Sequence, residues 1–136
     1  GWIAVRGEFG VEAAVLSLSV IFWIAGFDML YSTQDIEFDR HEGLQSIAAR
    51  FGIPATLWIA RGSHVLSVVS LIALGFVAPL AWPYWVGVGL VAALLGFENL
   101  LVRPTDLSKL NVAFFNMNGY VAVTVLVFTV IGVWLA

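Results

Sequence analysis

Residues 11–40 read VEAAVLSLSVIFWIAGFDMLYSTQDIEFDR, an apolar run that passes directly into an acidic segment. The apolar part, residues 11–31, has the length of about 20 residues that a helix needs to cross the hydrocarbon core of a bilayer. A period-two alternation of apolar and polar residues is absent, which argues against a transmembrane β-barrel. The stretch therefore predicts a membrane-spanning helix that carries carboxylates at one end.

Three further apolar stretches, at residues 54–78, 82–102 and 113–136, meet the same length requirement. Backbone polar groups in lipid must be satisfied within their own segment, so we expect helices. The composition agrees, because 61% of the residues are hydrophobic and 11% are charged, whereas charged residues make up roughly a quarter of a soluble domain. We predict an all-α bundle of four transmembrane helices, with residues 1–136 belonging to a single domain.

Composition also excludes several classes of function. The chain has no cysteine, which rules out disulfides and thiolate sites. A net charge of -3 without a basic block argues against a nucleic-acid partner. The chain contains no motif for a nucleophile elbow, for the zinc-binding helix of a metalloprotease or for a phosphate-binding loop. The first residues contain neither Met nor a charged n-region, so they do not form a signal peptide, and we expect a longer protein.

The basic residues predict the orientation in the membrane. Only Arg6 lies before the first apolar stretch, and the other five lie in or beside the first and third connections, at Arg40, Arg50, Arg61, Arg103 and Lys109. Because basic loops stay on the cytoplasmic side, we expect the acidic segment there, in the cell inner membrane, with both chain ends opposite. Trp82, Tyr84 and Trp85 fit an interfacial aromatic belt at that opposite side.

The acidic segment places several candidate ligands on one stripe. If the first helix continues at 100° per residue, Asp28, Tyr31, Asp35 and Asp39 fall within about 60° of one another. Asp35 and Asp39 are then one turn apart, so their carboxylates can grip a shared cation. Mg²⁺ bridges carboxylates to substrate phosphates and acts as a Lewis acid on a leaving group. Arg40 can add a charge-assisted hydrogen bond to a phosphate oxygen, and Tyr31 can donate its hydroxyl.

Two other functions use the same residues. The Asp-x-x-x-Asp spacing by itself is also typical of a solvated loop, but a carboxylate at Asp28 inside an apolar segment costs a few kcal/mol and favours a functional site. In a cation transporter, Asp28, Asp35 and Asp39 would bind a travelling cation. In an assembly subunit, the polar residues would only pair helices. A transporter requires a polar path across the bilayer, whereas a transferase requires an apolar cavity beside the acids.

Polar residues inside the later helices have structural interpretations. Arg61 can extend toward the membrane surface and His64 can be a satisfied packing residue. Glu98 can pair with Arg103. Asn118 can form interhelical amide hydrogen bonds, and it is also a candidate substrate contact.

The run at residues 23–52 resembles the UbiA superfamily of intramembrane aromatic prenyltransferases. Its closest resemblance is to the 4-hydroxybenzoate polyprenyltransferase type and to relatives in menaquinone synthesis. Tyr31, Asp35 and Asp39 match the family's Tyr-x-x-x-Asp-x-x-x-Asp motif, and residues 43–47 match the Gly-Leu-x-Ser-Ile tail that follows. Residues 111–118 look like the family's penultimate loop.

The resemblance implies helices six to nine of a nine-helix fold. In the family, an Asn-Asp-x-x-Asp motif in the N-terminal half faces this one across a cavity that holds Mg²⁺ and an isoprenyl diphosphate, and no such motif occurs here. The resemblance implies that Asp35 and Asp39 are metal ligands. It also implies an aromatic acceptor and a set of substrate contacts, which are Asp28, Tyr31, Arg40 and Asn118. The chain is expected to be inactive without the N-terminal half. Aromatic candidates for sheltering the allylic cation are Phe22, Trp23, Phe27 and Phe115.

Overall fold

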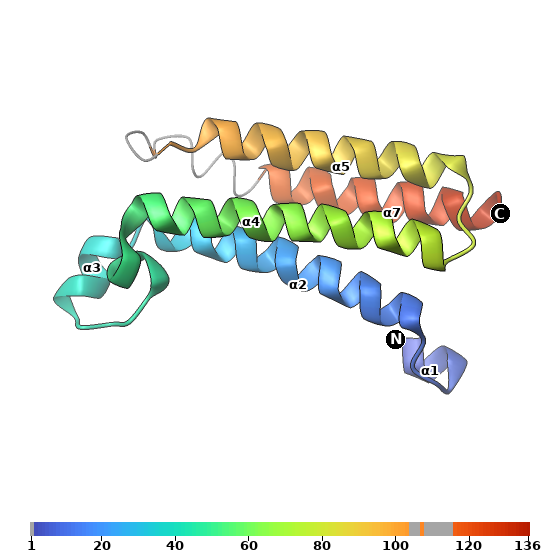
Figure 1. Cartoon of the computed structure of the whole chain (residues 1–136), viewed down its shortest axis with the longest axis horizontal. Coiled ribbons are helices and arrows are strands. Elements are labelled where there is room, and N and C mark those ends of the chain that lie inside the picture. The colour runs from blue at the N-terminus through green and yellow to red at the C-terminus, as the bar shows by residue number, and fades with distance from the viewer. Residues whose placement is uncertain (1, 104–106, 108–115) are drawn as a thin grey trace.

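The computed structural model describes residues 2–103, 107 and 116–136, and every regular element among them is a helix (Figure 1). This confirms the predicted all-α class. The helices, in chain order, are α1 (Trp2–Arg6), α2 (Val11–Ser32), α3 (Ile36–His41), α4 (Ile47–Val77), α5 (Trp82–Leu101) and α7 (Asn118–Trp134).

Three of the helices, α2, α4 and α5, are long and apolar enough to span a membrane. The fourth predicted span, residues 113–136, corresponds to α7, whose 17 residues are apolar but shorter. Residues 113–115, where that span was predicted to begin, lie outside the described residues.

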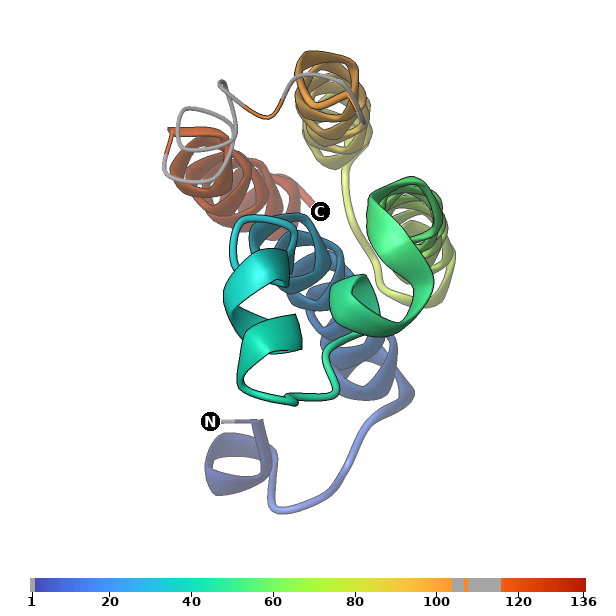
Figure 2. The ribbon, with the colours of Figure 1, turned by 90° about the vertical axis from the view of Figure 1, so that its left-hand side faces the viewer.

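The long helices lie side by side with their ends in two groups. Helix α3 and the start of α7 lie at one end, and α1 and the C-terminus lie at the other (Figure 1). The C-terminal ends of α2 and α5, where the first and third predicted connections begin, both point toward the end at which α3 lies (Figure 1). Viewed along the bundle, α2, α4, α5 and α7 surround a common interior (Figure 2).

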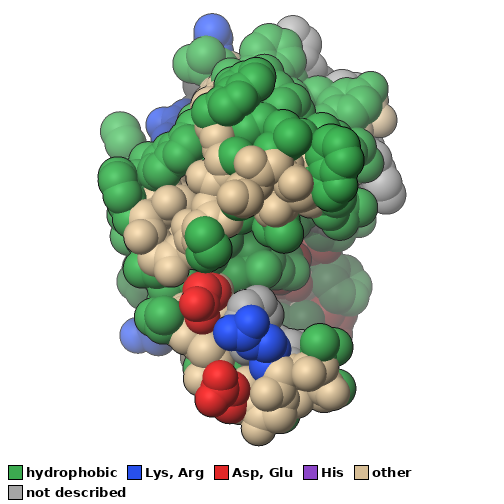
Figure 3. Space-filling view, turned by 90° about the vertical axis from the view of Figure 1, so that its right-hand side faces the viewer, with side chains coloured by type: hydrophobic (Ala, Val, Ile, Leu, Met, Phe, Trp, Pro, Cys, Tyr) green, Lys and Arg blue, Asp and Glu red, His purple; other side chains and the backbone are tan. Residues whose placement is uncertain are grey.

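The interior is apolar along most of its length. Its buried side chains come from all four long helices and include Phe27, Leu71, Leu74, Tyr84, Val88, Val91, Leu95 and Val121. The outward faces are apolar too, as the exposed fractions of Phe76 (77%) and Trp134 (82%) illustrate. Seen from the end opposite α3, green apolar side chains cover much of the visible surface and only a few charged side chains appear (Figure 3). A bundle that is apolar both inside and outside is an integral membrane protein.

Small residues bring α2 and α4 close together. The hydroxyl of Ser67 donates to the Ser19 carbonyl over 2.9 Å. Further along α2, Gly26 lies so near the imidazole of His64 that a Cβ atom there would overlap the ring. Close backbone approach at small residues is the usual way in which membrane helices associate, and here it holds the helix that leads into the acidic segment.

Two local features decide where α4 begins and bends. The Ser46 side chain accepts a hydrogen bond from the Ala49 N–H at 3.1 Å and caps the helix. Gly52 then takes φ 81°, which glycine adopts readily, so the helix kinks two residues before Pro54. The predicted span 54–78 is the straight part of α4 beyond this kink.

The aromatic belt was predicted wrongly at one position. Trp82 is exposed at the bundle end, but Tyr84 is buried, and its hydroxyl donates to the Leu71 carbonyl over 2.7 Å. A tyrosine whose hydroxyl finds a backbone acceptor loses the reason to face the interface. Tyr84 is therefore a core residue.

Candidate acidic site at the end of the bundle

Helix α2 ends before the acidic motif does. The Ser32 hydroxyl donates to the Met29 carbonyl at 2.9 Å, and the Thr33 hydroxyl donates to the Leu30 carbonyl at 2.6 Å. Ser and Thr hydroxyls can hydrogen-bond to backbone carbonyls in competition with backbone N–H groups. Here they do so in the last turn of α2, where the helix ends. The prediction of one continuous helix, with Asp28 through Asp39 on a single stripe, is therefore wrong.

The two central carboxylates are nevertheless held one turn apart. Asp35 is the residue before α3, and its carbonyl oxygen accepts the Asp39 N–H at 2.8 Å. Asp35 is exposed and Asp39 is half-buried. The predicted one-turn spacing of this pair is confirmed, although a separate short helix provides it.

The end of α3 explains the residues that follow the acids. Gly43 takes φ 69°, the Leu44 N–H donates to the Asp39 carbonyl at 2.8 Å, and the Gly43 N–H donates to the Arg40 carbonyl at 3.4 Å. This pair of bonds around a left-handed glycine is a Schellman motif. Ser46 then caps α4. The Gly-Leu-x-Ser pattern thus encodes a helix stop and a helix start, which fixes α3 against α4.

Among the described residues, no basic side chain lies within ion-pair distance of Asp35 or Asp39. Within the described part of the chain, the one ion pair is an exposed contact of 3.3 Å between His41 and Glu42. No three Asp, Glu or His side chains of the described residues gather around one point. Asp35 and Asp39 therefore offer two hard oxygen donors, which fits Mg²⁺ because this ion takes few protein ligands and keeps several waters.

Two arginines, Arg40 and Arg50, lie where α3 ends and α4 begins. The Arg40 Nε donates to the Ala49 carbonyl at 3.2 Å, and both Arg40 and Arg50 line an open hollow of about 440 Å³ between the end of α3 and the start of α4. The sequence interpretation missed Arg50. The signal available was the Ser46 cap, which places Arg50 in the first turns of α4, beside the acidic helix.

The remaining candidates lie around this end of the bundle. Asp28 is exposed one turn before the end of α2, and Tyr31 is 39% exposed near its last residue. Asn118 is the first residue of α7 and is half-buried. The structure thus brings Asp28, Tyr31 and the pair of Asp35 and Asp39 to one end of the bundle, without placing them on one helix face.

The aromatic candidates divide differently. Phe27 is 2% exposed, and its ring packs against those of Trp23 and His64 at centroid distances of 5.9 and 5.2 Å. Phe27 is therefore a packing residue within this bundle. Phe22 and Trp23 are half-buried on α2, and Phe115 lies outside the described residues.

The predicted pair of Glu98 and Arg103 does not form. Glu98 is fully buried and neither carboxyl oxygen has a hydrogen-bond partner among the described residues, whereas Arg103 is exposed. Val91, Leu95 and Glu98 lie at helical spacing on the buried face of α5, so the Glu98 side chain faces the interior of the bundle. His64 is buried, and its Nδ1 accepts a hydrogen bond from the Asn99 Nδ2 at 2.8 Å.

A cation transporter needs a polar path that continues across the bilayer. The described interior holds the apolar cluster around Leu71, Val91 and Val121. Its buried polar side chains include Ser67 and His64, which form contacts between neighbouring helices. The acids lie at one end, beside the turn between α3 and α4.

Comparisons with known proteins give one family and several relatives. A family model described as the UbiA prenyltransferase family matches residues 1–120. The mitochondrial 4-hydroxybenzoate polyprenyltransferase of Arabidopsis thaliana is 34% identical over 110 residues, which are 80% of this chain and 26% of the relative. No solved structure matches the chain significantly.

Bacterial relatives match a similar region. The 4-hydroxybenzoate octaprenyltransferase of Xanthomonas campestris pv. campestris is 31% identical over 119 residues, covering 87% of this chain and 39% of the relative. That of Cupriavidus pinatubonensis is 29% identical over 118 residues, covering 85% and 40%. The chain thus spans well under half the length of these relatives.

Proposed function

Because the chain belongs to the UbiA prenyltransferase family, we propose that it acts, as part of a longer chain, in transferring a polyprenyl group from an isoprenyl diphosphate to an aromatic acceptor. The relatives named above carry 4-hydroxybenzoate in their names, which supports this acid as the acceptor and ubiquinone biosynthesis as the route. A naphthoate acceptor in menaquinone biosynthesis is the competing assignment.

The pairing of Asp35 and Asp39 on α3 is the observation that carries the proposal. The hydrogen bond from the Asp39 N–H to the Asp35 carbonyl fixes their spacing, and no basic side chain of the described residues pairs with either acid. Two such carboxylates would hold Mg²⁺. When bound, this ion would neutralise charge on the departing diphosphate.

The side chains around the acids would bind and orient the diphosphate. Arg40 and Arg50 line the hollow between α3 and α4, so their guanidinium groups supply charge-assisted donors to phosphate oxygens. Tyr31 would donate its hydroxyl to the leaving group, and Asp28 and Asn118 would orient the acceptor. Once the allylic carbon–oxygen bond breaks, the electron-rich ring attacks the cation and loses a proton.

The membrane setting of the site follows from the same end of the bundle. We assign the protein to the cell inner membrane, with α3 on the cytoplasmic side, because Arg40 on α3, Arg50 in the first turn of α4 and Arg103 just after α5 carry basic charge there. The N-terminal half of the protein would supply the facing acidic motif and complete the cavity.

The test is prenyl transfer by the full-length protein in membranes. We expect Asp35→Asn and Asp39→Asn each to lower the Mg²⁺-dependent rate by about a hundredfold or more, the scale of removing one transition-state charge stabiliser. Glu37→Gln is the matched control, because Glu37 is an exposed carboxylate on α3 outside the Asp35–Asp39 pair. The assay offers 4-hydroxybenzoate and a hydroxynaphthoate side by side.

Three results would count against the proposal. Transfer at the wild-type rate in both aspartate variants would remove the acids from the reaction. An equal loss in Glu37→Gln would show a general effect of charge on α3. A preference for the naphthoate would replace the assigned acceptor while leaving prenyl transfer in place.

A further inference from the structure

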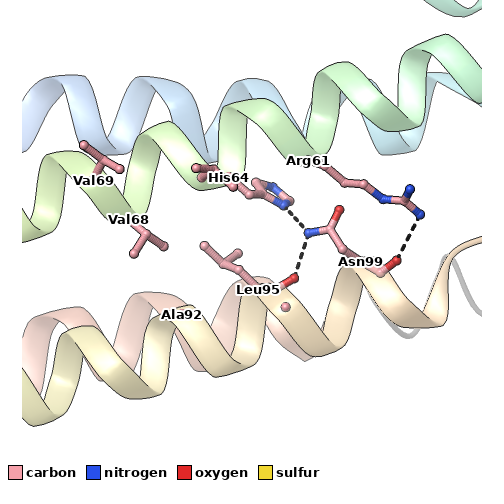
Figure 4. Close-up of a pocket in the computed structure, with 9 residues that line it drawn as sticks. Arg61, His64, Val68, Val69, Ala92, Leu95 and Asn99 are labelled. Carbon is pink, nitrogen blue, oxygen red and sulfur yellow. Dashed lines mark hydrogen bonds between the residues drawn. The ribbon is translucent and has the colours of Figure 1, made fainter.

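An open groove of about 320 Å³ runs between α4 and α5 (Figure 4). Its walls are apolar along most of its length and come from Val65, Val68 and Val69 on α4 and from Ala92, Leu95 and Gly96 on α5. Val65 and Val69 are 61% and 53% exposed, so the groove opens to the surroundings of the bundle. An apolar trough on a membrane helix pair suits a hydrocarbon chain.

One end of the groove carries a positive charge. Arg61 is half-buried there, and its guanidinium carbon lies 5.1 Å from the centre of the Trp58 ring. Its Nη2 lies 3.5 Å from the Asn99 carbonyl oxygen (Figure 4). No carboxylate of the described residues lies within ion-pair distance of Arg61. A charge in a membrane span is costly and is normally paired, so this end of the groove calls for an anion.

A hydrogen bond between α4 and α5 fixes the geometry of the groove beside Arg61. The Asn99 Nδ2 donates to the His64 Nδ1 at 2.8 Å and to the Leu95 carbonyl at 2.7 Å (Figure 4). His64 in turn is wedged against Gly26 of α2, where no side chain would fit. Helices α4 and α5 are thus tied together beside Arg61, and the groove is preformed.

The length of the groove matches one leaflet of a bilayer. From Arg61 to Val69 the helix rises by about 12 Å, and half of the hydrocarbon core of a membrane is about 15 Å. Arg61 faces the end of the bundle where α3 lies, and the apolar walls extend from it toward the middle of α4. The charge therefore lies at the head-group end of a path that one chain can follow inward.

We propose that this groove binds an anionic phospholipid, with the phosphate on Arg61 and one acyl chain between α4 and α5. The volume suits a single chain, and the cation at Arg61 selects a lipid whose net charge is negative over a zwitterionic one. This inference concerns a lipid site outside the acidic helix and does not depend on the proposed prenyl transfer.

The experiment measures which lipid the full-length protein retains. The protein is placed in nanodiscs of phosphatidylglycerol and phosphatidylcholine in equal parts, and the lipids that stay bound after release are identified by native mass spectrometry. We expect retained phosphatidylglycerol in the wild type and about fivefold less in Arg61→Gln, the effect of one basic residue near a membrane surface. Arg103→Gln is the charge control, because Arg103 is exposed at the same end and lies outside the groove.

A second pair of variants tests the apolar part without touching the charge. Gly96→Leu places a side chain in the groove, where a Cβ meets no atom within 4 Å, and Gly89→Leu makes the same change at an exposed position of α5 that is equally open and outside the groove. We expect Gly96→Leu to lose the bound lipid and Gly89→Leu to keep it.

Several outcomes would overturn the assignment. Equal retention of phosphatidylcholine would show that Arg61 does not select the head group. Unchanged retention in both Arg61→Gln and Gly96→Leu would place the lipid elsewhere, or show that the rest of the protein covers the groove. A retained prenylated aromatic acid in place of phospholipid would assign the groove to product. None of these readouts requires turnover, so they stand apart from the test of Asp35 and Asp39.

Discussion

The backbone N–H of Leu44 donates to the carbonyl oxygen of Asp39 over 2.8 Å, while the Asp39 N–H donates to the Asp35 carbonyl. The second acidic residue is thus bonded along the chain in both directions. The bond to Leu44 exists because Gly43, between them, takes φ 69°. The position of the acidic pair therefore depends on one glycine that is not itself part of the site.

We expect Gly43→Ala to strain the turn that follows α3 and so to disturb the position of Asp39. An L residue at this φ costs about 1–2 kcal/mol, so the full-length protein should need a higher Mg²⁺ concentration for half-maximal prenyl transfer. Gly7→Ala is the control, since Gly7 has φ 74° and a Cβ added there, as at Gly43, would meet no atom within 4 Å. Equal shifts in Mg²⁺ requirement for both variants would mean that strain anywhere, and not the placement of Asp39, causes the effect.

Gly26→Ala tests the packing of α2 on α4. A methyl group at Gly26 would overlap the His64 ring, and overpacking of this kind costs about 1–3 kcal/mol in the free energy of unfolding. The measurement is SDS titration in mixed micelles. The double variant with His64→Ala should be less destabilised than the sum of the two single changes. Additive losses would place the strain at another contact of Gly26.

The sequence predicts the fold class and the end at which the site lies, because both depend on bulk patterns. Four apolar stretches and the clustering of Arg40, Arg50 and Arg103 are strong signals that local contacts do not alter. The structure confirms the fold class at the level of α2, α4 and α5, and the location of the site stays a prediction.

Details set by single side-chain contacts were predicted less well. The continuous helix through Asp39 failed because the hydroxyls of Ser32 and Thr33 bond to carbonyls of the last turn, a choice that periodicity does not reveal. Tyr84 was assigned to the interface because its carbonyl partner, on Leu71, comes from a different helix. In each case the deciding partner is a backbone carbonyl, which every residue has and no sequence pattern marks.

Tyr84→Phe isolates the contribution of that buried hydroxyl. The change removes the 2.7 Å bond to the Leu71 carbonyl, so the free energy of unfolding should fall by about 0.5–1.5 kcal/mol. Tyr120→Phe serves for comparison, because Tyr120 is 56% exposed on α7, and it should change stability by less than about 0.5 kcal/mol. Stability that is unaffected by the change at Tyr84 would contradict the core assignment.

A substitution at Glu98 is expected to stabilise the protein, whereas Tyr84→Phe is expected to destabilise it. Its carboxyl oxygens are buried and unpaired among the described residues, so Glu98→Met, which keeps the length and removes both oxygens, should raise the free energy of unfolding by about 1–3 kcal/mol, the penalty for a buried polar group without a partner. Glu37→Met, at an exposed position of α3, should alter stability by no more than about 0.5 kcal/mol. SDS titration of the full-length protein decides the matter. Destabilisation by Glu98→Met would mean that the complete protein supplies a partner for the carboxylate, and that α5 contributes a buried polar contact to the other helices.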